Sequence, residues 1–106
     1  MTMTAIDVLA PGHVAVVTGG ASGIGLAAAR AFVRRGMNVV LADRDETTLA
    51  LALAEFAGSD AQVLARPLDV ADRGALETLR DEVMGRFGAV HVLMNNAGIQ
   101  PGSALF

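Results

Sequence analysis

Short apolar runs alternate along the chain with longer segments whose apolar residues recur at helical spacing. The runs read as buried strands, since several are continuous and rich in β-branched residues. They lie at 13–18, 38–42, 61–66 and 90–94. The intervening amphipathic segments, which read as helices, lie at 23–35, 45–57 and 71–87. This alternation predicts an α/β fold with residues 1–12 as an N-terminal leader and one domain over residues 13–106.

Each helical segment carries an apolar stripe that we expect to face the sheet. The stripe residues are Ile24, Ala28 and Phe32; Leu49, Leu53 and Phe56; and Leu76, Leu79, Val83 and Phe87. Asp45 is expected to cap the second helix, and Pro67 to end the third strand or place it at an edge. Strands that alternate with helices, joined to them by short connections, indicate a parallel sheet with right-handed crossovers. The prediction is a Rossmann-type doubly wound parallel sheet of about four strands, in the order 3-2-1-4, with helices on both faces.

A glycine-rich turn, TGGASGIG at 18–25, leads from the first strand into the first helix. Glycines let the backbone approach a pyrophosphate closely, and the helix N-terminus offers free N–H groups and partial positive charge. The alternative is a plain connecting turn. A P-loop is excluded because Leu26 and Ala27 follow the last glycine, and a nucleophile elbow because Ile24 stands where it needs glycine. The candidate cofactor-binding residues here are Gly19, Ser22, Gly23, Ile24 and Gly25.

Asp43 ends the second strand, 18 residues after Gly25, near the usual spacing of the acid that binds the adenosine ribose. A carboxylate there accepts bonds from ribose hydroxyls and repels a 2′-phosphate, which favours NAD over NADP. Arg44 opposes this preference, because a guanidinium beside the ribose can bind a phosphate. The alternative is that this acidic stretch is only the solvated start of a helix.

Polar or small residues also follow the third and fourth strands. Asp69 is either a capping acid in a turn or an acceptor for the adenine amino group, with Val70 offering its backbone. Asn95 and Asn96 leave the fourth strand for a loop, where Asn commonly serves turn geometry, and Ala97 and Gly98 add no bulk beside a ribose and a nicotinamide. The candidate cofactor-binding residues here are Asn96, Ala97 and Gly98. Ser22 either binds a phosphate, caps the first helix, or does both. Because parallel strands end at one edge of the sheet, all four turns are expected there, where doubly wound folds bind ligands.

Composition narrows the possible functions. The net charge of −3 gives no reason to expect nucleic acid or an anionic membrane as a partner. There are no cysteines, and His13 and His91 read as strand-entry residues, so no metal site is predicted. We expect a cytoplasmic protein, because residues 1–11 do not resemble a signal peptide and no run is long enough to span a membrane. All eight basic residues are arginines and there is no tyrosine.

In combination these motifs resemble the short-chain dehydrogenase/reductase family. The matching pieces are the turn at 18–25, Asp43, Asp69-Val70 and the Asn-Asn-Ala-Gly run at 95–98, and the resemblance covers about residues 12–106. It implies binding of NAD(H) or NADP(H), with NAD preferred where an acid occupies the position of Asp43. It also implies hydride transfer between the nicotinamide and a small alcohol or carbonyl substrate in the complete fold.

The chain departs from the family pattern in its catalytic residues. The family uses a serine, a tyrosine–lysine pair and an asparagine that follow the fourth strand, and the sequence ends before their positions, so no catalytic residue is assigned. We expect a cofactor-binding N-terminal part of an oxidoreductase that binds without turnover, and that self-associates or forms a homo-oligomer because sheet area is left bare. The alternatives are a non-catalytic nucleotide-binding or interaction module, and a truncated product without function.

Overall fold

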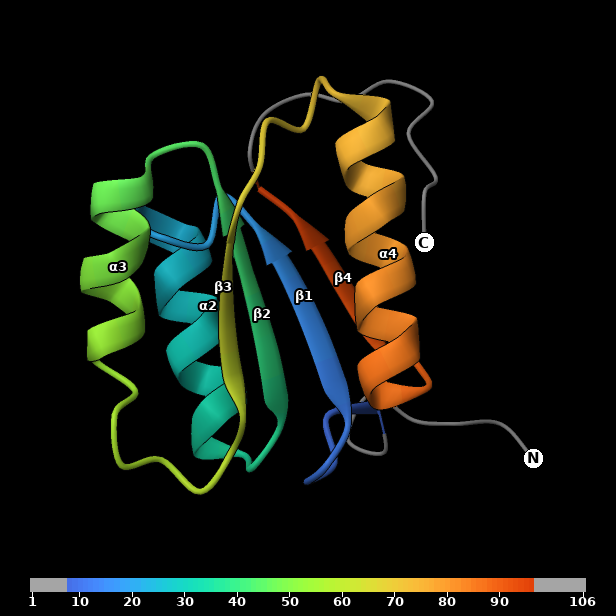
Figure 1. Cartoon of the computed structure of the whole chain (residues 1–106). Coiled ribbons are helices and arrows are strands. Elements are labelled where there is room, and N and C mark those ends of the chain that lie inside the picture. Colours follow the sequence, from blue (N-terminus) through green and yellow to red (C-terminus); the bar gives the residue numbers. More distant parts are fainter. Residues whose placement is uncertain (1–7, 97–106) are drawn as a thin grey trace.

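The computed structural model describes residues 8–96, and strands and helices alternate through that range (Figure 1). Every strand and helix predicted from the sequence is present and in the expected order. The elements are β1 (Val14–Thr18), α2 (Gly23–Arg34), β2 (Asn38–Asp43), α3 (Glu46–Ala54), β3 (Val63–Pro67), α4 (Arg73–Phe87) and β4 (Val92–Asn95).

The strands form one parallel sheet in the order β3-β2-β1-β4, as predicted. β1 is central and pairs on both sides, so Val16 lies opposite Val40 of β2 and Leu93 of β4. Because all strands run the same way, their carboxyl ends meet at one edge of the sheet, at the arrowheads in Figure 1. The turns that the sequence predicts to bind a dinucleotide lie at this edge.

Alternate side chains of β1 and β2 enter two separate cores, one on each face of the sheet. Ala15 and Val17 pack in the core with α2 and α3, whereas Val14 and Val16 pack in the core with α4. Figure 1 shows the helices divided in this way, with α2 and α3 on one face and α4 on the other. All of β1 is buried because both faces of the sheet are covered, which explains its unbroken apolar run.

Both edge strands begin later than predicted, because side chains take the place of ladder partners. β3 begins at Val63 rather than 61, since the N–H of Ala61 donates to Ser59 Oγ and that of Gln62 donates to Asn38 Oδ1. β4 begins at Val92 rather than 90. In both cases the apolar pattern starts about two residues before the first residue that pairs with the neighbouring strand. Pro67 is the last residue of β3, at a sheet edge, as expected.

The helices are shorter than the pattern predicts, because local hydrogen bonds define their ends. α3 ends at Ala54 instead of about 57, and the next amides, beginning with Glu55, bond three residues back in a tighter turn. α4 begins at Arg73 instead of about 71, because the Asp72 carboxylate accepts from the Ala75 N–H at 3.0 Å and caps it. Asp45 caps α3 as predicted, by accepting from the Thr48 N–H.

Two stripe residues that we expected to be buried are exposed. The buried residues of α2 are Gly25, Leu26 and Ala29, and Ile24 is 71% exposed, whereas Phe32 packs against the core as predicted. In α3, Leu49 and Ala52 are buried while Leu53 is 36% exposed. The small residues Gly25 and Ala52 are buried as well, which a pattern of large apolar residues does not detect. The stripe of α4 is as predicted: Leu76, Leu79 and Val83 are buried, with Phe87 packed against them.

Candidate functional site

The turn between β1 and α2 can be formed only with glycine at several positions. Gly19 and Gly23 have positive φ, +66° and +57°. At Gly25 a Cβ atom would collide with the carbonyl oxygen of Gly19, and at Gly20 it would lie 2.9 Å from the oxygen of Val17. The turn therefore folds tightly back on itself, with bare backbone at the start of the helix.

Backbone bonds fix this turn to the end of β2, and among residues 8–96 the first N–H groups of α2 have no acceptor. The N–H groups of Gly19 and Gly20 both donate to the carbonyl of Ala42, at 2.7 and 3.2 Å. The first bond of α2 runs from the Leu26 N–H to the Ser22 carbonyl. The N–H groups ahead of it, which have no intrahelical acceptor, belong to Gly23, Ile24 and Gly25. They carry the partial positive charge of the helix N-terminus, which suits an anion.

Ser22 occupies the N-cap position, but within the described range its side chain makes no capping bond. Of the two roles left open by the sequence, capping is therefore not performed by the hydroxyl in this structure. Ser22 and Ile24 are both exposed at the mouth of the turn. Their side chains border the free donors of the helix start.

Asp43 extends from the end of β2 to the glycine turn. Its Oδ2 accepts from the Ala21 N–H at 3.1 Å, and its Oδ1 accepts from the Asp45 N–H at 3.3 Å. The carboxylate is half-buried. The acid expected to bind a ribose and the turn expected to bind a pyrophosphate are thus in direct contact.

Thr18 joins the ends of β1 and β4 at the same edge. Its hydroxyl donates to Asn95 Oδ1 at 2.8 Å and accepts from the Asn96 N–H at 3.1 Å, and only 3% of Thr18 is exposed. The Asn96 side chain lies beside Gly25, since a Cβ atom there would be 3.1 Å from Asn96 Nδ2. Sequence reasoning singled out Asn96 but gave Thr18 no role. The signal that could have found it is a hydroxyl at the end of an otherwise apolar buried strand.

Asp69 stabilises the turn after β3 and lies beside the end of β2. Its Oδ1 accepts from the Ala71 N–H at 2.9 Å, and its Oδ2 is 3.9 Å from a terminal nitrogen of Arg44. The N-cap of α4 is Asp72, so the capping role that the sequence allowed for Asp69 is wrong, and its alternative role toward the adenine stays a prediction. Val70 is half-buried and packs against the core on the α4 face. The structure thus brings together the turns after all four strands.

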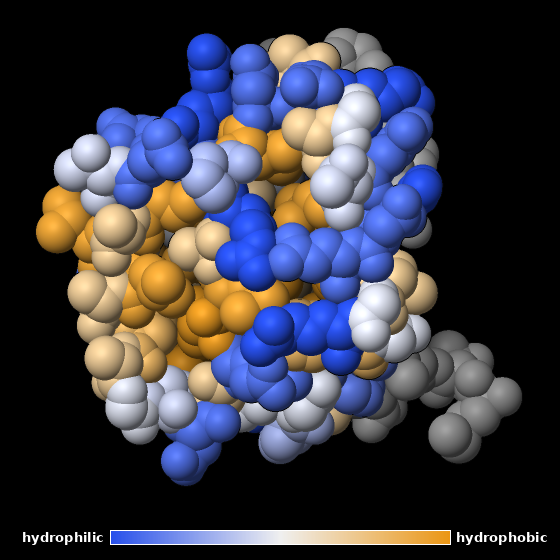
Figure 2. All heavy atoms as spheres, in the orientation of Figure 1, coloured by the Kyte–Doolittle hydropathy of each residue, from blue (hydrophilic) through white to orange (hydrophobic). Residues whose placement is uncertain are grey.

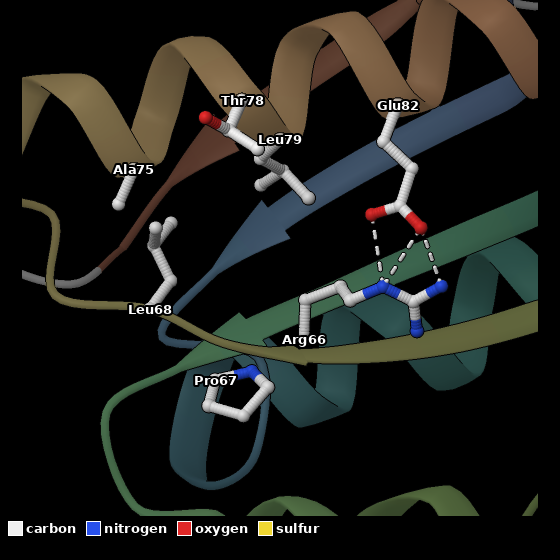
Figure 3. A pocket seen from close by; sticks show the side chains of 7 residues that line it. All are labelled: Arg66, Pro67, Leu68, Ala75, Thr78, Leu79 and Glu82. Carbon is white, nitrogen blue, oxygen red and sulfur yellow. Dashed lines mark hydrogen bonds and ion pairs between the residues drawn. The ribbon is translucent and has the colours of Figure 1, made fainter.

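A shallow hollow of about 360 Å³ lies between the turns after β2 and β3 and the start of α4, and is lined by Arg44, Glu46, Pro67, Leu68, Asp69, Asp72 and Ala75. A second hollow of about 240 Å³ adjoins it between β3 and α4, sharing Pro67, Leu68 and Ala75 (Figure 3). Figure 3 shows an ion pair between Arg66 of β3 and Glu82 of α4. Its shortest nitrogen–oxygen distance is 2.6 Å. Neither hollow is indicated by the sequence pattern.

The residues present fit a dinucleotide. The close approach at Gly25 and the free N–H groups beside it suit a pyrophosphate, and the neighbouring carboxylate of Asp43 suits a ribose. Ala97 and Gly98 lie outside the described residues. Among residues 8–96, no cluster of three side chains suited to a metal is present, and no helix is both long and apolar enough to cross a membrane.

The family model described as short chain dehydrogenase matches residues 13–105. The chain belongs to the short chain dehydrogenase family. This match includes every element of the fold and all four turns of the site. The family and the Rossmann-like architecture expected from the sequence are thereby confirmed.

Individual short chain dehydrogenases agree with this assignment. The short chain dehydrogenase/reductase dpmpG of Macrophomina phaseolina is 45% identical over 89 residues, covering 83% of this chain and 51% of that protein. A short chain dehydrogenase/reductase from Burkholderia phymatum, solved in complex with NAD, has a TM-score of 0.74 and 38% identity, over 78% of this chain and 30% of that one. A metagenomic short-chain oxidoreductase solved with NADP has a TM-score of 0.79 and 34% identity, over 86% and 41%. The chain thus spans about half the length of that relative and less than half of those structures.

Proposed function

We propose that this chain is the cofactor-binding portion of an oxidoreductase that transfers hydride between a nicotinamide dinucleotide and a small alcohol or carbonyl substrate. The binding unit is residues 13–106, preceded by a leader at 1–12. The observation that carries the proposal is the contact between Asp43 and the glycine turn, 3.1 Å from carboxylate to backbone N–H. This contact puts the carboxylate proposed to bind the ribose beside the turn proposed to bind the pyrophosphate, at the carboxyl ends of the strands.

Each candidate residue then has a defined task. The N–H groups of Gly23, Ile24 and Gly25 bind the pyrophosphate, with Ser22 adding its hydroxyl, and Gly19 gives the turn its shape. Asp43 binds the adenosine ribose, and Asp69 with Val70 faces the adenine. Asn96, Ala97 and Gly98 border the nicotinamide ribose. The bound dinucleotide supplies the hydride acceptor or donor, while this chain positions it.

NAD is the proposed cofactor in preference to NADP. A 2′-phosphate beside the Asp43 carboxylate would be repelled, because the two groups carry the same charge. Arg44, the group that could offset this repulsion, has 75% of its side chain exposed and lies 3.9 Å from Asp69. Its charge is therefore shared with another carboxylate at the same edge.

The 106 residues include no tyrosine and no lysine. A tyrosine–lysine acid–base pair of the family type would therefore have to come from outside them, and we propose that this chain alone binds the dinucleotide without turnover. A non-catalytic nucleotide-binding module is the second candidate, and it requires the same dinucleotide site.

Self-association is proposed from the exposed apolar surface. Figure 2 shows apolar side chains gathered on the α3 side of the molecule and along β3. A groove of about 500 Å³ opens there, lined mainly by Leu53, Phe56, Val63 and neighbouring alanines. Burying such a surface against a second copy would remove apolar area from water.

Calorimetric titration of the chain with NAD and NADP tests the proposed function. The expected result is binding of both, with NAD the tighter, and an Arg44→Ala change should weaken NADP more than NAD. Absence of heat with either dinucleotide, together with a folded chain by circular dichroism, would contradict the binding proposal. Equal affinities for NAD and NADP that diverge on removal of Arg44 would contradict only the cofactor preference.

A further inference from the structure

The Asp43 carboxylate is held by the backbone of this protein on both of its oxygens, before any ribose is considered. Oδ2 accepts from Ala21 in the glycine turn and Oδ1 accepts from Asp45 at the start of α3. We propose that Asp43 is a positioning residue that holds the glycine turn in its anion-binding shape, in addition to its task toward the ribose. This inference rests on the proposed dinucleotide site and adds a role in that site.

The Ala21 N–H depends on Asp43 because Ala21 is buried, with only 3% of its surface exposed. A buried N–H without an acceptor costs about as much as a lost hydrogen bond plus its desolvation. The two preceding amides, of Gly19 and Gly20, bond to the backbone carbonyl of Ala42. Ala21 is therefore the point where a side chain, rather than the backbone, holds the turn.

The position of Ala21 makes this bond matter for the ligand. Ser22 follows it as the N-cap of α2, and the free donors of Gly23 to Gly25 come next. If the Ala21 amide turned away to find water, the peptide planes after it would rotate as well. The donors would then no longer converge on one anion.

Both tasks of Asp43 can be performed at the same time. A carboxylate has two oxygens with two lone-pair positions each. One position on each oxygen is used by the bonds to Ala21 and Asp45. One position on each oxygen remains to accept a ribose hydroxyl, so the bond that shapes the turn persists when the ribose binds.

Charge and hydrogen bonding make opposite predictions for an anion that contains no ribose. As a charge, Asp43 repels inorganic pyrophosphate, so its removal should strengthen binding. As a positioning group, Asp43 maintains the donors, so its removal should weaken binding. Asp43→Ala removes both the charge and the acceptor, whereas Asp43→Asn removes the charge and keeps an oxygen for the Ala21 N–H.

The test is titration of the chain with inorganic pyrophosphate, combined with amide hydrogen exchange of Ala21 measured by NMR. We expect Asp43→Ala to speed exchange of the Ala21 N–H and weaken pyrophosphate binding, each by about five- to tenfold. Asp43→Asn should keep exchange near the wild-type rate and bind pyrophosphate at least as well. Glu46→Gln, which removes one negative charge from an exposed position in the first turn of α3, is the matched charge control and should leave Ala21 exchange unchanged.

Unchanged Ala21 exchange in Asp43→Ala, or pyrophosphate binding as tight as in Asp43→Asn, would overturn the positioning role. If Asp43→Ala fails to fold, exchange in Asp43→Asn decides: a wild-type rate supports the role, and a rate raised tenfold contradicts it. If the wild-type chain binds neither NAD nor pyrophosphate, the proposed function fails. Ala21 exchange still reports on what Asp43 does to the turn.

Discussion

The imidazole rings of His13 and His91 stack face to face, with their centroids 3.8 Å apart and their planes 9° from parallel. They precede β1 and β4, at the edge of the sheet opposite the candidate site. His91 Nδ1 accepts from the Val14 N–H at 2.9 Å, and the His91 N–H donates to the Val14 carbonyl. The Val14 N–H therefore bonds to the His91 side chain instead of a backbone carbonyl of β4, and regular pairing with β4 begins at the next residue, Val92.

This pair should make stability depend on pH. Burial, and to a lesser degree the neighbouring His13, lowers the pKa of His91. The unfolded chain then takes up a proton at higher pH than the folded chain, so unfolding free energy should fall as pH drops from about 7 through 6.5 toward the folded pKa. Protonation at Nδ1 also removes the acceptor for Val14. Urea unfolding between pH 5.5 and 7.5 measures the slope.

Two variants isolate the contribution of His91. His91→Phe keeps a ring for stacking but does not titrate, so its slope over this range should be shallower than that of the wild type. It should also be less stable at pH 7.5, by about 1 kcal/mol for the lost bond. His13→Phe keeps the bond to Val14 and should lie between the two in slope. If the unfolding free energy of the wild type and of His91→Phe changed equally with pH, His91 would not be the source of the pH dependence.

Gly25→Ala should disrupt the site and Gly85→Ala should not. The added methyl at Gly25 meets the Gly19 carbonyl, so we expect a loss of about 1–3 kcal/mol in stability and of NAD binding. Gly85 lies inside α4 with open space where its Cβ would be, so alanine there should stabilise by up to about 1 kcal/mol. Thermal unfolding and NAD titration of both variants check this. Wild-type affinity in Gly25→Ala would contradict the close approach.

Thr18→Val should loosen the joint between β1 and β4. Valine fills the same space but removes the buried hydroxyl that bonds to Asn95 and Asn96, at a cost of about 1 kcal/mol. Thr18→Ser keeps the hydroxyl and should recover most of that loss. Thr78→Val, which removes an exposed hydroxyl bonded to the Gly74 carbonyl on α4, is the matched control and should change stability little. A Thr18→Val variant no less stable than the Thr78 control would show that the joint is unimportant.

Ser22→Ala and Asp72→Ala should separate binding from stability. Asp72 caps α4 with its side chain, so its removal should cost about 1 kcal/mol of stability. Ser22 makes no capping bond with its side chain in the structure, so its removal should change stability by only a few tenths. It should weaken NAD binding, since the hydroxyl is proposed to face a phosphate. Chemical unfolding and calorimetry measure the two effects; an equal stability loss in both variants would assign Ser22 to capping.

Leu53→Lys should reduce self-association more than Leu51→Lys. Both residues lie on α3 and are exposed, but Leu53 lines the apolar groove beside β3 and Leu51 is not among its lining residues. A charge in the groove would remain unpaired on burial against a second copy. Sedimentation velocity over a range of concentrations measures the effect. A wild-type chain that stays monomeric throughout would contradict the proposal itself.

The sequence was sufficient to predict the strand order and the positions of the turns because β-branched runs and glycine stops report on backbone preferences. It could not predict contacts that depend on register between distant strands. The stacking of His13 on His91 and the Thr18 bonds require β1 and β4 to align, and these strands are more than 70 residues apart. The burial of Gly25 and Ala52 was missed for a different reason, because glycine and alanine carry little hydrophobic signal.

The central position of β1 has a consequence for how the chain is made. Its partner on one side, β2, follows within about 20 residues, whereas its other partner, β4, is the last of the described strands to be synthesised. Closing so long a loop is slow, and the edge of β1 stays open until it happens. The joint at Thr18 cannot form during translation before Asn96 has left the ribosome, so a nascent chain holding β1, β2 and β3 would present a bare strand edge to chaperones or to other chains.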